Sequence, residues 1–178
     1  MTGSPIASPE RVWWEPFSKP ERLWVSVSVV FLLLVFLSMP VWVISGKQNQ
    51  PNTFYRVSPD RYLKLTDAFI SRYKVGQEGL LPIVKPPVDG DAYLMAEQWV
   101  WTPILELQRG KTYRLHVSSI DVEHSVSIQP ININFEVAPG YDEILNITPT
   151  KDGVYTIICN EYCGIGHATM TGQIIVNG

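Results

Sequence analysis

The pattern of apolar and polar positions divides the chain into a membrane-like segment and a strand-rich region. Residues 23–45 read LWVSVSVVFLLLVFLSMPVWVIS and carry no charged side chain. As a helix this segment is about 34 Å long, enough to cross a hydrocarbon core of about 30 Å. The run is too long for the apolar core of a signal peptide and lacks a small-x-small cleavage site. We therefore expect one retained transmembrane helix over residues 23–45, preceded by a lead-in of residues 1–22.

A second helix is expected between the span and the strand-rich region. Ser58 is suited to the N-cap, Pro59 to the first helical position and Asp60 to the first turn. Apolar residues then recur at helical spacing, and Gly76 can end the helix; they are Tyr62, Leu65, Phe69 and Tyr73. The pattern predicts an amphipathic helix over about 59–75. We expect this helix to pack on the membrane surface, on a partner protein or on its own domain. The rest of the linker, 46–57 and 76–91, is expected to be an extended connection.

From residue 92 onward apolar and polar residues alternate, which is typical of half-buried strands. The expected strands are 93–101, 104–108, 112–118, 124–128, 131–137, 142–148, 154–159 and 172–177. Short strands joined by Gly- and Pro-containing turns predict an all-β antiparallel sandwich or Greek-key barrel over residues 92–178. The formal net charge of −3, from 14 basic and 17 acidic residues, gives no basic stripe, so nucleic-acid binding is not expected.

Both cysteines of the chain lie in the short segment CNEYCGIGHATM, residues 159–170. Thiolate, imidazole and thioether form a soft ligand set, which suits copper better than magnesium, calcium or manganese. Two thiolates four residues apart can lie side by side and bridge two metal ions. The spacing therefore favours a dinuclear copper centre with a role in electron transfer.

The expected ligand set extends beyond this segment to His124, which lies between two predicted strands. Cys159 and Cys163 would bridge the two coppers, with His124 serving one ion and His167 the other. Two weaker ligands are expected in addition, the thioether of Met170 and the backbone carbonyl of Glu161. His116 is expected to be a solvated strand residue and no ligand.

Three other interpretations of the cysteine pair remain open from the residues alone. The two cysteines can form a disulfide in an oxidising compartment. Two cysteines and two histidines can hold a structural zinc ion. A mononuclear blue copper site uses one cysteine, two histidines and a weak methionine, and it leaves the second cysteine without a role.

The segment 159–170 resembles subunit II of haem–copper cytochrome c oxidases. The family pattern, a distant His followed by Cys-x3-Cys-x3-His-x2-Met, is complete here. The resemblance extends through DVEHS (121–125), VAPG (137–140) and GVY (153–155) and covers about residues 92–178. It implies a cupredoxin fold, a dinuclear CuA cofactor and electron entry into an oxidase. A single span in place of the family's usual two-helix hairpin resembles the short, B-type branch.

The resemblance also suggests roles for residues around the loop. In many family members the side chain at the position of Glu161 helps to hold Mg²⁺ at the contact with subunit I. Aromatic residues near Trp99 and Trp101 receive electrons from the donor; both tryptophans are expected on one strand face with Tyr93 and Met95. Asp121 and Glu123 lie beside the expected ligand His124 and are acids that can steer a basic donor.

The expected function is electron entry: the chain accepts electrons from cytochrome c or a small copper protein and passes them to haem in subunit I, where O₂ is reduced. The chain would belong to an enzyme without performing bond chemistry itself. The alternatives are the CuA subunit of a membrane nitric oxide reductase, and a tethered copper store. The positive-inside rule does not decide the orientation. We place the copper domain outside the cytoplasm of a cell membrane because redox copper centres usually work there; Trp13, Trp14, Trp24 and Trp42 would mark the membrane interfaces.

Overall fold

The computed structural model describes residues 16–46 and 53–178. The chain forms two compact units, Met1–Lys47 and Gln48–Gly178. The expectations for residues 1–15, including the interfacial roles of Trp13 and Trp14, and for the linker residues 47–52 lie outside the described residues.

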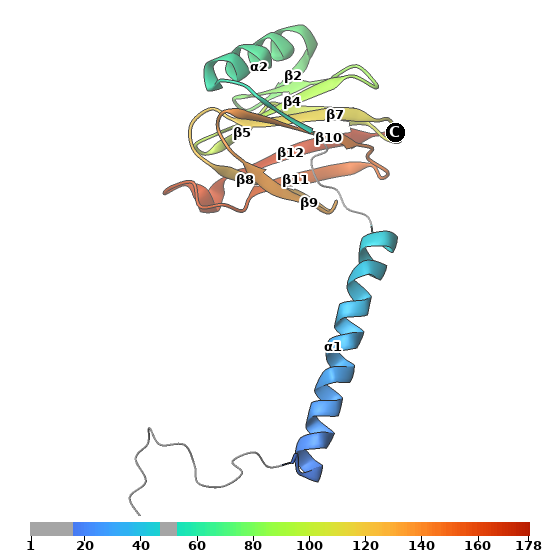
Figure 1. Cartoon of the computed structure of the whole chain (residues 1–178). Coiled ribbons are helices and arrows are strands. Elements are labelled where there is room, and N and C mark those ends of the chain that lie inside the picture. The colour runs from blue at the N-terminus through green and yellow to red at the C-terminus, as the bar shows by residue number, and fades with distance from the viewer. Residues whose placement is uncertain (1–15, 47–52) are drawn as a thin grey trace, which may run out of the picture. The chain divides into compact units, whose positions relative to one another are not determined.

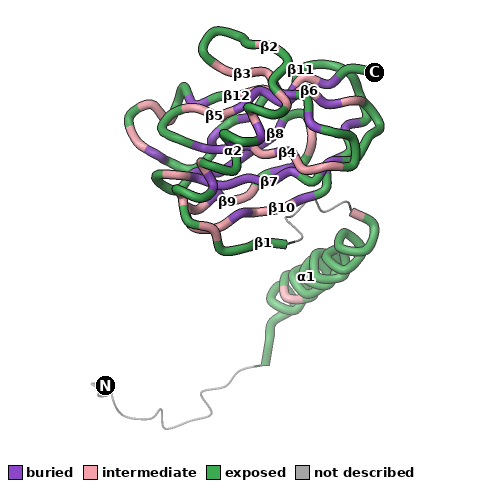
Figure 2. Tube along the Cα trace, turned by 90° about the horizontal axis from the view of Figure 1, so that it is seen from above, coloured by how far each residue is buried: buried purple, intermediate pink, exposed green. Residues whose placement is uncertain are grey.

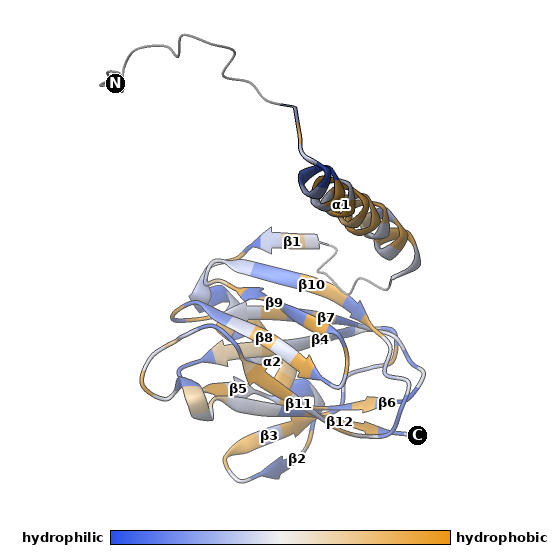
Figure 3. Ribbon diagram, turned by 90° about the horizontal axis from the view of Figure 1, so that it is seen from below, coloured by the Kyte–Doolittle hydropathy of each residue, from blue (hydrophilic) through white to orange (hydrophobic). Residues whose placement is uncertain are grey.

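The first unit contains one long helix, α1 (Lys19–Ser45). It begins four residues before the uncharged run because Ser18 forms a capping box with Glu21: the side chain of each accepts a hydrogen bond from the backbone N–H of the other. Apolar side chains surround the helix on all sides and are exposed (Figures 2 and 3). In the described part of the chain, α1 is the helix that is long and apolar enough to cross a membrane.

The second unit is a sandwich of two sheets with a helix, α2 (Pro59–Tyr73), on one outer face (Figure 1). One sheet has the strand order β1-β10-β7-β4-β5 and the other has the order β2-β3-β6-β12-β11-β8-β9. The strands are β1 (Thr53–Arg56), β2 (Lys74–Glu78), β3 (Leu81–Val84), β4 (Asp91–Glu97), β5 (Val100–Thr102), β6 (Ile104–Gln108), β7 (Tyr113–Ser119), β8 (His124–Gln129), β9 (Ile133–Val137), β10 (Tyr141–Ile147), β11 (Gly153–Cys159) and β12 (Thr171–Asn177).

The all-β fold with one apolar N-terminal helix is confirmed, but three details of the prediction are wrong. Residues 53–56 and 76–84, expected to be connections, contain β1 and most of the β2–β3 hairpin, and the expected helix over about 59–75 ends at Tyr73. The expected strand 93–101 turns at residues 98–99 and becomes β4 and β5. The sheets are mixed, because β12 runs parallel to β6, β3 to β6, and β4 to β7.

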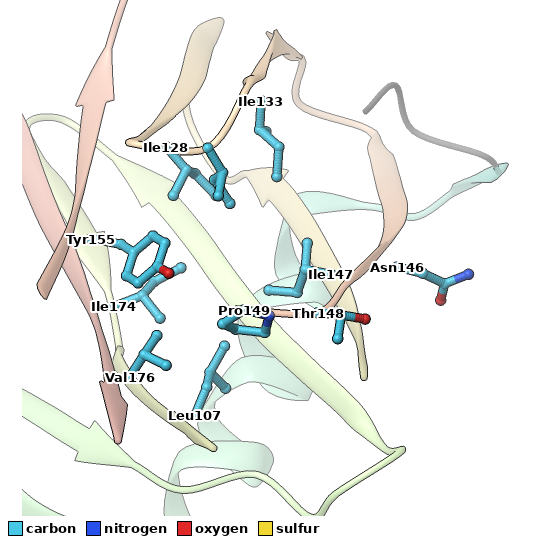
Figure 4. Close-up of a pocket in the computed structure, with 11 residues that line it drawn as sticks. Leu107, Ile128, Ile133, Asn146, Ile147, Thr148, Pro149, Tyr155, Ile174 and Val176 are labelled. Atoms are coloured by element: carbon cyan, nitrogen blue, oxygen red, sulfur yellow. The ribbon is translucent and has the colours of Figure 1, made fainter. Parts of the chain in front are cut away.

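The core lies between the two sheets and is filled by alternate residues of the strands (Figure 2). At the end of the sandwich away from the 159–170 loop, the core leaves a cavity of about 90 Å³ (Figure 4). Its lining is mainly aliphatic, with Ile128, Ile133 and Ile174 among the residues that surround it, while the side chain of Asn146 points away.

Helix α2 packs on the outer face of the β4 sheet through Tyr62, Thr66 and Phe69, which are buried. The rings of Tyr62 and Phe69 lie 6.0 and 5.5 Å from the ring of Tyr93 on β4. The Tyr62 hydroxyl donates a hydrogen bond of 3.1 Å to the carbonyl of Leu94. Among the three surfaces considered for this helix, the structure places it on its own domain.

The expectation that His116 is solvated is wrong: only 9 % of its surface is exposed. Its Nδ1 lies 2.8 Å from Asp142 Oδ2, and its Nε2 lies 3.2 Å from Asp91 Oδ1. These contacts link the adjacent strands β10, β7 and β4, and the Tyr93 ring stacks on the imidazole at 4.5 Å. The strand pattern indicated the face on which His116 lies, but it gave no information on the two carboxylates that flank it.

We expect His116 to stabilise the domain more at acidic than at alkaline pH. Burial lowers the pKa of His116, but the hydrogen bonds and charges of Asp142 and Asp91 outweigh it and raise the pKa above its usual value. A raised pKa in the folded state means that this stabilisation is full below about pH 6.5 and is lost as the pH rises through the folded-state pKa. The titratable groups that contact the imidazole are Asp91, Asp142 and Tyr93, and Arg114 in turn bonds Asp91.

The test compares the free energy of unfolding of the wild type and His116→Gln in urea, from pH 5.5 to above the folded-state pKa. The difference should be about 2 kcal/mol at the acidic end and should shrink as the pH rises. A difference that stays constant with pH would contradict a stabilising role for the charged imidazole.

Candidate metal centre

Two loops at one end of the sandwich bring the expected ligands together. Strand β11 ends at Cys159, and the chain returns through a short 3-10 helix, His167–Thr169, into β12. The neighbouring strand β8 begins at His124, and its Val126 pairs with Cys159. Strands β8 and β11 lie side by side (Figure 1), and their antiparallel pairing brings the imidazole of His124 beside Cys159.

The two sulfur atoms form the centre of the site. Cys159 Sγ and Cys163 Sγ lie 3.8 Å apart, and both thiols are free and buried. His124 Nδ1 lies 3.7 Å from Cys159 Sγ, and His167 Nδ1 lies 3.7 Å from Cys163 Sγ. Each cysteine thus has one imidazole beside it.

Two weaker donors complete the arrangement. The sulfur of Met170 lies 3.6 Å from Cys163 Sγ, and the carbonyl oxygen of Glu161 lies 3.3 Å from Cys159 Sγ. The side chain of Glu161 is exposed, whereas Met170 is almost fully buried. The expected donors therefore divide into one group around each cysteine.

These separations suit metal binding. A metal ion takes thiolates at about 2.3 Å and imidazole nitrogen at about 2.0 Å, so two sulfurs sharing one ion lie less than about 4.6 Å apart. By the same arithmetic, a sulfur and a nitrogen that share one ion lie less than about 4.3 Å apart. The observed separations of 3.8 and 3.7 Å fall inside both limits. The atoms of His124, Cys159 and Cys163 also lie within 4.8 Å of one another, so the donor set fits a soft ion such as copper.

Asp121 orients the first imidazole, a role that the sequence analysis missed. Its Oδ1 lies 2.9 Å from His124 Nε2, so the Nε2–H is held by the carboxylate and Nδ1 faces Cys159. Partial burial raises the pKa of Asp121, but hydrogen bonds from His124, Gln98, Val122 and Ser119 outweigh it and leave the pKa below its usual value. The spacing of three residues between Asp121 and His124 is the sequence feature that points to this contact.

The thiol of Cys163 is protonated at neutral pH when no metal is bound. Burial, followed by the hydrogen bond and charge of Cys159, raises the pKa of Cys163 to about 11. Because a metal binds the thiolate, copper uptake by this loop releases protons.

The two tryptophans near the loop occupy different positions, so the expectation that they share a strand face is wrong. Trp101 lies on β5 opposite Ala96, faces the core and is 1 % exposed. Trp99 lies in the corner between β4 and β5 and is 41 % exposed. The turn at residues 98–99 interrupts the alternation on which the prediction relied.

Each tryptophan packs against a different part of the site. The ring of Trp101 stands edge-on to the ring of His124, with 6.2 Å between centroids. The ring of Trp99 covers Gly166 so closely that a Cβ there would lie 2.4 Å from Trp99 Cδ2. Glu123 is exposed beside the site and makes no ion pair among the described residues.

Comparison with known proteins shows what the C-terminal part of the chain is similar to. Residues 100–178 match the family model described as cytochrome c oxidase subunit II, periplasmic domain. The chain is 38 % identical over 85 residues to a cytochrome c oxidase subunit 2 of Thermus thermophilus, and the match covers 47 % of this chain and 63 % of that protein. Residues 100–178 are therefore similar to the periplasmic domain of cytochrome c oxidase subunit II. A second Thermus thermophilus subunit 2 shows the same identity over 51 % of its length, so the chain matches less than two thirds of either relative.

Solved structures show that the domain has a cupredoxin-like fold. A chain from a cryo-EM structure of a heme-copper terminal oxidase dimer is 25 % identical, with a TM-score of 0.54, and the match covers 89 % of this chain and 100 % of that one. Rusticyanin, in its His143Met variant, is 16 % identical with a TM-score of 0.51, over 70 % of this chain and 98 % of that one. The likeness to rusticyanin concerns the fold alone.

Proposed function

We propose that the chain is the electron-entry subunit of a membrane haem–copper oxidase. The observation that carries this proposal is the pair of buried thiols 3.8 Å apart with an imidazole 3.7 Å from each. This symmetry provides a complete strong-donor set for two coppers, whereas a mononuclear site needs only one of the cysteines. The similarity to cytochrome c oxidase subunit II supports the same interpretation.

The residues of the site have distinct roles in this proposal. Cys159 and Cys163 would hold two copper ions between them together with His124 and His167, and Met170 and the carbonyl of Glu161 would be the weak ligands. The copper centre would supply one-electron chemistry. The rigid end of the sandwich holds the donors in place, so the ligand geometry changes little on reduction.

The proposal includes a location and partners. Helix α1 anchors the chain in a cell membrane, and the sandwich domain, which begins at β1 (Thr53–Arg56), lies on the extracytoplasmic side. The electron donor is cytochrome c or a small copper protein, and the acceptor is haem in subunit I, which reduces O₂. The exposed side chain of Glu161 is free to contribute to a Mg²⁺ site against subunit I.

We expect Met170→Leu to retain both coppers and to raise the reduction potential, because a weak axial donor is lost. The measurement is redox titration of the copper-loaded chain, with copper counted per chain. Met95→Leu is the matched control, since Met95 is also buried but contacts none of the donors. Loss of copper from Met170→Leu would mean that Met170 is a structural ligand.

The function is tested by purifying the native complex through an affinity tag on this chain. We expect a haem-containing subunit to copurify, and we expect the complex to consume O₂ when supplied with reduced cytochrome c or a reduced cupredoxin. Copper-dependent reduction of nitric oxide without O₂ consumption would instead favour the nitric oxide reductase alternative. Exchangeable copper without electron transfer would favour a copper store.

A further inference from the structure

We propose that Gln98 is a positioning residue that ties the two copper-ligand loops to each other. The inference rests on the proposed function, because Gln98 would keep the copper donors of the two loops at fixed positions relative to each other. Gln98 lies in the corner between β4 and β5, outside both ligand loops.

Gln98 contacts both loops through different groups. Its backbone N–H donates a hydrogen bond of 2.7 Å to Asp121 Oδ2, and the other oxygen of Asp121 lies 2.9 Å from His124 Nε2. Its side-chain amide donates a hydrogen bond of 2.5 Å to the carbonyl of Cys163. One residue therefore connects the carboxylate that orients His124 with the backbone of the second cysteine.

The neighbouring residue strengthens this connection by packing. The ring of Trp99 lies against Gly164 and Gly166, the two glycines between Cys163 and His167. A Cβ at Gly166 would lie 2.4–2.7 Å from three atoms of the Trp99 ring, so only glycine allows this contact. The loop is thus covered by Trp99 and bonded by Gln98 from the same corner.

The two contacts act on different donors of the site. The backbone N–H of Gln98 is present in any variant, so Asp121 and His124 keep their support when the side chain is changed. The side-chain amide acts on the loop that carries Cys163, His167 and Met170. Removing the amide alone should therefore loosen that loop and leave the domain folded.

The metal-free full chain in detergent micelles provides the first test. Cys159 and Cys163 are 3 % and 4 % exposed, so a neutral disulfide reagent such as 4,4′-dithiodipyridine reacts with them only after the loop opens. In Gln98→Met, which keeps the length and removes the amide, we expect the reaction rate to rise about three- to tenfold, the equivalent of one hydrogen bond. The free energy of unfolding in urea should fall by no more than the equivalent of that one hydrogen bond.

The control is Gln129→Met at the opposite end of β8, where the side-chain amide bonds Ser127 Oγ at 3.0 Å. It removes the same chemical group and should leave the thiol reaction rate unchanged. Equal rates in Gln98→Met and the wild type would overturn the proposal. A loss of global stability in urea much larger than the rise in rate would also overturn it, because the substitution would then disrupt the whole domain and not the loop alone.

Copper loading provides a second readout. In Gln98→Met we expect two coppers to remain bound, with a shifted reduction potential and an altered copper hyperfine pattern in the electron paramagnetic resonance spectrum. The wild-type potential and spectrum in this variant would overturn the positioning role. The thiol reaction needs no copper, so a chain that binds no copper would refute the proposed function without deciding the role of Gln98.

Discussion

The Cys159→Ser substitution should abolish the dinuclear copper centre while leaving the domain folded. A serine hydroxyl is a hard donor that does not ionise near neutral pH, so it cannot replace a bridging thiolate. The remaining donors around Cys163, namely His167 and Met170, can hold one copper ion. We expect the copper content to fall from about two per chain to about one or less, with loss of the mixed-valence spectrum.

The matched control is His116→Asn, because His116 is a buried histidine in the same sandwich that contacts Asp91 and Asp142 and none of the donors. It should retain the copper content and the spectrum of the wild type. Two coppers and an unchanged spectrum in Cys159→Ser would disprove the bridging role of Cys159.

The Trp101→Ala substitution should cause the largest loss of stability of any single change near the site. Trp101 is 1 % exposed and is the largest fully buried side chain among the described residues. Its removal leaves a cavity beside His124 and Gly172, and comparable losses of a buried tryptophan cost about 3–5 kcal/mol. Urea unfolding of the full chain, followed by circular dichroism, measures this loss.

Trp99→Ala is the natural comparison because Trp99 is 41 % exposed. It should cost much less in the same assay, since a half-exposed ring contributes less buried area. A cost below about 1 kcal/mol for Trp101→Ala would show that the core around His124 collapses into the space, and that the ring does not support the imidazole.

The copper loop could be predicted from the sequence because its chemistry is local. Cys159, Cys163, His167 and Met170 lie within twelve residues, and their spacing alone suggests that their donors meet. His124 was found because the strand pattern placed it at a strand start, and antiparallel pairing of β8 with β11 brings it to the loop. The all-β class followed from the two-residue periodicity after residue 92.

Features that depend on distant partners were not predictable in this way. Strand β1 is short and exposed on every residue, and it is a strand only because β10 pairs with it. The carboxylates of Asp91 and Asp142 come from strands on either side of β7, so nothing local showed that His116 is buried between them. The turn at Gln98 likewise separates Trp99 from Trp101, although alternation places both residues on one face.

The proposed dinuclear copper centre is tested by electron paramagnetic resonance of the copper-loaded full chain, with copper counted per chain. We expect two coppers per chain and hyperfine splitting from two equivalent copper nuclei that share one unpaired electron. Splitting from a single copper nucleus, or a chain that binds no copper because Cys159 and Cys163 form a disulfide, would contradict it.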